Sequence, residues 1–86
     1  MTEQITYYAI VAPRATREDP AGIARRCRRL ETGGFRDEAL GLGMIWHFTP
    51  VIVGWERAES TDDLVEISEE DAQRLIEHLR VKWEGL

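Results

Sequence analysis

Cysteine, lysine and long apolar runs are scarce in this sequence. Its single cysteine, Cys27, excludes a disulfide within the chain. The most apolar stretch, residues 42–55, contains His47 and Pro50 and is shorter than the ~20 residues that a membrane-spanning helix needs. Residues 1–4 are polar, and the apolar run behind them is too short for a secretory signal. We therefore expect a soluble, cytoplasmic protein with no membrane segment.

The length of 86 residues suits one small domain, spanning residues 1–86. Hydrophobic residues make up 43% of the chain and charged residues 31%, which excludes a disordered protein. The core of so small a domain is thin and supplies only about 3–5 kcal/mol. Because a dimer would bury more surface, a homodimer is one expected state.

Charge is unevenly distributed along the chain, whose net charge is −5. Residues 1–30 carry six arginines and three acidic residues, whereas residues 31–86 carry five basic and thirteen acidic residues. This split allows a basic patch on an acidic body, and it also allows two copies to pair head to tail. All basic residues except Lys82 are arginine, which we interpret as the codon usage of a GC-rich bacterial genome.

β-Branched and aromatic residues predict short strands at residues 5–12, 44–48 and 64–67. Thr49-Pro50 resembles a helix cap followed by proline in the first turn, and it favours a short helix over residues 49–58. Val51 to Gly54 are weak helix formers, so a strand from Val51 is the alternative.

The clearest element is an amphipathic helix from Ser68 to about Trp83. Ser68 and Asp71 have the spacing of a capping box, and acidic residues fill the first turn, where the helix dipole favours them. One apolar stripe follows the helical period: Ala72, Leu75, Ile76, Leu79 and Trp83. We expect this helix to pack on one face of a sheet. Its outer face, where Val81 is the one apolar residue, would then meet solvent or a partner.

Residues 20–40 allow two structures. Asp19-Pro20 resembles a helix start, and an apolar stripe at helical spacing (Ile23, Ala24, Cys27 and Leu30) favours a helix. Gly33-Gly34 equally suits the turn of a hairpin between residues 23–30 and 35–40. The period alone favours the helix, and the residues themselves leave both structures open.

Several short segments resemble a group of small uncharacterised proteins from high-GC bacteria. They are Tyr7-Tyr8-Ala9, Gly22-Ile23 with Arg25-Arg26, Asp37-Glu38-Ala39, Trp46 with Thr49, Trp55-Glu56-Arg57, and Val65 to Glu70 before Ala72. The resemblance covers most of the chain and implies a hairpin through the Gly-Ile and Asp-Glu-Ala segments and a short helix after Thr49. It implies no activity, ligand or site.

The first candidate site is a cluster of four arginines: Arg25, Arg26, Arg28 and Arg29. A guanidinium group can donate two parallel hydrogen bonds to the oxygens of one phosphate, so the cluster suits binding to nucleic acid. The alternative is that these arginines pair with the abundant carboxylates of the chain. We expect that alternative, because nucleic-acid-binding domains are usually basic and this chain is not.

Other candidate residues carry weaker signals. Among the three tryptophans, we expect Trp55 to be exposed and, beside Arg57, to form an interaction hot spot. Cations near Cys27 would lower its pKa, although a lone cysteine is more often a small buried hydrophobe. His47 and His78 lack metal-ligand spacing, and the acidic run from Glu56 to Asp71 lacks that of a calcium loop. We therefore expect no catalytic residue, metal or cofactor.

Together these patterns predict an α+β domain. Its antiparallel sheet would have three to four short strands, with the C-terminal helix on one face and a short helix near residues 49–58. The expected function is a non-enzymatic protein-interaction or regulatory module acting through Arg25, Arg26, Arg28, Arg29 and Trp55, with a protein partner or a second copy. Nucleic-acid binding through residues 25–29 is the alternative.

Overall fold

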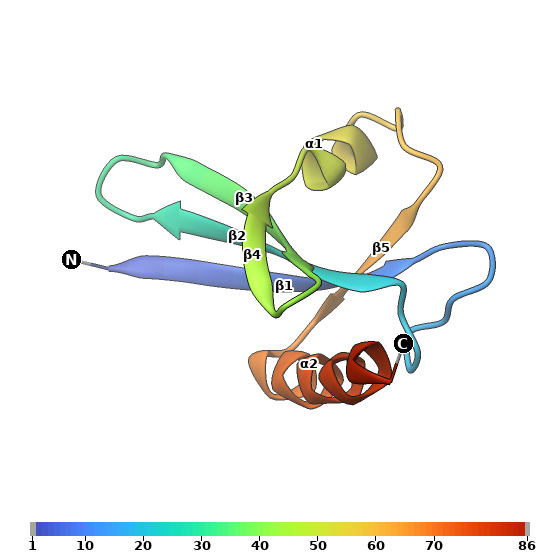
Figure 1. The fold of residues 1–86 in the computed structure, drawn as a ribbon. Coiled ribbons are helices and arrows are strands. Elements are labelled where there is room, and N and C mark those ends of the chain that lie inside the picture. The colour runs from blue at the N-terminus through green and yellow to red at the C-terminus, as the bar shows by residue number, and fades with distance from the viewer. Residues whose placement is uncertain (1, 86) are drawn as a thin grey trace.

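A computed structural model describes residues 2–85 as a five-stranded antiparallel sheet with a helix on each face (Figure 1). The strands are β1 (Glu3–Val11), β2 (Gly22–Arg29), β3 (Phe35–Gly41), β4 (Ile45–Phe48) and β5 (Asp63–Ile67), and the helices are α1 (Val51–Glu56) and α2 (Glu69–Glu84). The strand order β4-β3-β2-β1-β5 makes β4 and β5 the edges of the sheet. The predicted α+β class is confirmed, with five strands in place of three to four.

Residues 22–41 form the hairpin that the resemblance implied. β2 pairs with β3 from Ala24 opposite Ala39 to Arg28 opposite Phe35, and Gly33 takes a φ of 75° in the turn. The helix favoured by the apolar period is wrong at this point. A central strand is covered on both faces, so its apolar residues need not alternate, and their spacing here imitates a helix.

The two faces of the sheet hold two separate cores. On one face, α2 packs over β1 and β2, and the buried residues are Tyr7, Ala9, Ile23, Ile67, Ala72, Leu75 and Leu79. On the other face, α1 packs over β2 and β5 around Ala24, Ile52 and Leu64. Figure 1 shows the two helices on opposite sides of the strands. Neighbouring residues of β2 therefore serve different cores.

Helix α2 begins as the capping pattern predicts. The Ser68 hydroxyl accepts a hydrogen bond from the Asp71 backbone N–H at 3.0 Å. The loop between β1 and β2 is fastened to this helix, since Arg17 pairs with Asp71 at 3.1 Å and Asp19 contacts both His78 and Lys82. No helix within residues 2–85 is long and apolar enough to cross a membrane.

The short helix expected near residues 49–58 is α1. The Thr49 hydroxyl accepts a hydrogen bond from the Val51 N–H at 3.2 Å. Six residues rich in β-branched side chains do not form a stable helix in isolation. Tertiary contacts hold α1 instead, because Ile52 is fully buried against the sheet and Glu56 reaches an arginine of β2.

Candidate functional site

Arg26 lies inside the protein and is bound by two carboxylates. Its Nε and Nη2 donate to the two carboxylate oxygens of Asp37 at 2.8 and 2.9 Å, and Nη1 and Nη2 donate to Glu56 at 3.0 Å. The ring of Phe35 covers the guanidinium at 4.1 Å. These hydrogen bonds, with Asp37 the stronger influence, raise the pKa of Arg26 above its already high ordinary value. Arg26 therefore joins β2, β3 and α1 and is not available to a ligand.

Arg25 projects from the other face of β2 and is also engaged. Its guanidinium pairs with Glu38 on β3 at 2.8 Å and stacks over the Trp46 ring at 3.9 Å. Antiparallel pairing places Arg25 opposite Glu38 and Arg26 opposite Asp37. Two of the four candidate arginines are thus paired with carboxylates of the next strand.

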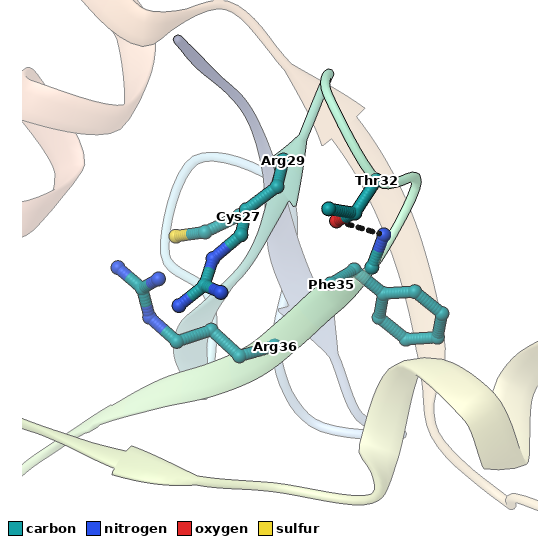
Figure 2. Close-up of a pocket in the computed structure, with 6 residues that line it drawn as sticks. Cys27, Arg29, Thr32, Phe35 and Arg36 are labelled. Atoms are coloured by element: carbon teal, nitrogen blue, oxygen red, sulfur yellow. Dashed lines mark hydrogen bonds between the residues drawn. The ribbon is translucent and has the colours of Figure 1, made fainter. Parts of the chain in front are cut away.

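Arg28 and Arg29 are exposed at the end of β2, on opposite faces of the sheet. Arg29 lines a shallow pocket of about 260 Å³ together with Cys27, Thr32, Gly34, Phe35 and Arg36. Figure 2 shows the Arg29 and Arg36 guanidiniums on the same side of the hairpin as the Cys27 sulfur, with the Phe35 ring turned away. Arg36 is bound by Glu3 at 2.7 Å, so much of the positive charge at this pocket is neutralised.

Cys27 lines that pocket but is only 1% exposed. Burial raises the pKa of its thiol, and this effect outweighs the opposing influence of Arg25 and Arg36. The expectation that nearby cations favour the thiolate is therefore not met. Cys27 behaves as a small buried hydrophobe within the sheet.

We predict that Cys27 reacts slowly with thiol reagents. A raised pKa leaves little thiolate at neutral pH, and burial blocks approach of the reagent. The rate with a chromogenic disulfide at pH 7.5 should lie well below that of free cysteine and rise to that level in urea. A native rate equal to that of free cysteine would contradict this burial.

Trp55 is the most exposed of the three tryptophans, at 36%. Its ring lies 6.0 Å from that of Tyr8 on the α1 face, whereas Trp46 and Trp83 are half-buried against the α2 core. The exposed position expected for Trp55 is thus present. Trp55 lies on α1, and Arg28 and Arg29 lie on opposite faces of the sheet, so the predicted residues form no single surface.

Four large exposed apolar side chains lie on β4 or close to it in the sheet, with Phe48 and Ile45 on opposite faces of the strand. Phe48 is 82% exposed and Ile45 57%, and Leu42 and Phe35 are also exposed. A groove of about 320 Å³ runs beside Phe48, and its lining is Phe35, Arg36, Asp37, Phe48, Thr49, Pro50 and Val53. Sequence reasoning missed this surface because the apolar run around β4 looked like core. The sequence did contain a signal of exposure. The run before Thr49-Pro50 is short, and its apolar residues occupy positions that face both sides of a strand.

Residues 2–85 contain no group of three or more His, Cys, Asp or Glu side chains placed to hold a metal ion. Searches with family models, curated proteins and solved structures found no match to the chain. The resemblance to small proteins of high-GC bacteria accordingly stays a prediction.

Proposed function

We propose that this protein is a non-enzymatic, cytoplasmic protein-interaction module that binds an extended segment of a partner along the edge of β4. The observation that carries the proposal is an edge strand with 82% exposure at Phe48 and an apolar groove beside it. An edge strand presents unpaired backbone N–H and C=O groups to a further strand. Apolar side chains at alternate positions then supply contacts for the incoming residues.

The contrast between the two edges supports this assignment. Natural sheets protect exposed edges with charged side chains. β5 follows this rule through Asp63 and Glu66, whereas the four residues of β4 (Ile45, Trp46, His47 and Phe48) include no acidic, lysine or arginine side chain. A further strand that pairs with β4 therefore meets less charge repulsion than one that pairs with β5.

The arginine distribution disfavours the nucleic-acid alternative. Arg25 and Arg26 are held by carboxylates, whereas Arg28 and Arg29 are exposed, with Arg28 lying over the Phe35 ring at 5.4 Å. Phosphate binding gains affinity from each cation that is free to replace counterions. Two exposed arginines on opposite sheet faces of an acidic chain offer little of that gain.

The proposed function predicts selective capture of strand-forming peptides. From a library of random 12-residue peptides, we expect the protein to enrich sequences rich in β-branched and aromatic residues. Phe48→Glu should abolish their binding in calorimetry, because a charge replaces the apolar contact. Val81→Glu, at a 59% exposed site on α2, is the matched control and should retain it. Equal binding by both variants, or no enriched sequence, would contradict an interface at β4.

A further inference from the structure

We infer that the segment bound by β4 is the β4 strand of a second copy, paired antiparallel with His47 opposite His47 of that copy. This inference rests on the proposed function and names its partner and register. The result would be a continuous ten-stranded sheet with a two-fold axis between the two edge strands.

The direction of the β4 peptide groups fixes which of them are free. In an antiparallel ladder, successive residues direct their N–H and C=O groups alternately to one neighbour and the other. The Thr49 N–H donates to the Asp37 C=O of β3 at 3.1 Å. Counting back from Thr49, His47 and Ile45 also face β3, so the peptide groups of Trp46 and Phe48 face outward.

One register satisfies both outward residues. With His47 opposite His47 of the second copy, Trp46 of each chain lies opposite Phe48 of the other. Each such pair exchanges two backbone hydrogen bonds. Centring the pairing on Phe48 would instead oppose Trp46 with Pro50, which has no N–H to donate. Centring it on Trp46 would oppose Phe48 with Met44, whose φ of 61° lies outside a strand.

Side chains favour the same register. Strand residues alternate between faces, so Trp46 and Phe48 share the α2 face while His47 lies on the α1 face. Each exposed Phe48 would pack against Trp46 of the other copy, and Trp46 is already held by Tyr7 and Arg25. Two aromatic rings that lie opposite each other on neighbouring strands form a favourable cross-strand pair.

Charge also favours a second copy as the partner. Self-pairing brings two strands of identical charge side by side, so a strand whose charges are all of one sign repels its copy. The β5 edge carries Asp63 and Glu66, so its self-pairing would bring carboxylates together. β4 has no acidic, lysine or arginine side chain and avoids this repulsion.

Disulfide trapping tests the register. In a Cys27→Ala background, His47→Cys should form a crosslinked dimer on mild oxidation. Residues in such a non-hydrogen-bonded pair have Cα atoms about 4.5 Å apart, within the range that a disulfide spans. Ile45→Cys is the matched control, on the same strand and face and also exposed. In the proposed register position 45 lies opposite position 49 of the second copy. The two introduced cysteines would therefore be four residues apart along the strand, and little crosslinking is expected.

Sedimentation of the full chain tests the dimer itself. The wild type should show a concentration-dependent dimer that high salt does not weaken, because β4 carries no acidic, lysine or arginine side chain to form an ion pair across the contact. Phe48→Glu should raise the dissociation constant about tenfold or more, and Val81→Glu should leave it unchanged. Circular dichroism checks that both variants fold.

Three results would overturn the inference: a monomer at every concentration, a dimer that loosens with salt, and equal crosslinking through positions 45 and 47. A monomer that still binds selected peptides through Phe48 would remove the second copy and leave the proposed function intact. A protein that neither dimerises nor binds selected peptides would overturn both this inference and the proposed function.

Discussion

Replacing Arg26 with alanine is expected to lower the free energy of unfolding by about 3–5 kcal/mol, as for other buried ion pairs that lose one partner. The reason is the position of Asp37, which is only 4% exposed and binds the Arg26 guanidinium through both oxygens. Alanine would leave that carboxylate buried with no cation beside it. It would also release Glu56 and so loosen α1 from β2.

Urea denaturation followed by circular dichroism measures the effect. The double variant Arg26→Met/Asp37→Leu should recover most of the loss, because it removes both charges and fills the same space with apolar atoms. Arg36→Met is the matched control, since its ion pair with Glu3 lies at the surface and should matter little. A small change for Arg26→Ala would mean that Asp37 reaches water in the folded state.

Replacing Leu75 with alanine is the second change expected to have a large effect, about 2–5 kcal/mol. Leu75 is fully buried at the centre of the α2 core, between the helix and the sheet. Its removal would forfeit the burial of the side chain and leave a cavity that the surrounding residues fill only in part. For a domain of this size, that loss is a large part of the whole stability.

The measurement is thermal and urea unfolding of Leu75→Ala beside Val81→Ala. Val81 lies on the same helix, six residues further on, with its side chain in solvent. Alanine has a higher helix propensity than leucine or valine, so any loss of stability in Leu75→Ala comes from packing. Similar free energies of unfolding for the two variants would show that the packing of Leu75 against the sheet contributes little to stability.

The C-terminal helix was predictable because its signals are local. Ser68, Asp71 and the apolar stripe all lie within one segment, and each describes a contact made inside the helix or along one face. The hairpin at residues 22–41 was not decided by such signals. Ile23 and Ala24 are buried in different cores on opposite faces of β2, and only the whole sheet explains why neighbours are both apolar.

The candidate site was predictable only in part, for the same reason. The number of carboxylates in the chain suggested ion pairs for the arginines, and Arg25 and Arg26 have them. Which carboxylate faces which arginine depends on the register of β2 and β3, a long-range property. The exposure of Phe48 depends on the position of β4 at an edge of the sheet. The residues of β4 alone do not determine that position in the strand order.

The position of β1 between β2 and β5 has a consequence for synthesis on the ribosome. β1 meets β2 early, but its other neighbour lies more than fifty residues later in the chain, and α2 later still. Until that last segment emerges, Tyr7, Ala9 and Ile23 present an uncovered apolar face. The nascent chain is therefore prone to aggregation until α2 has emerged and packed over this face.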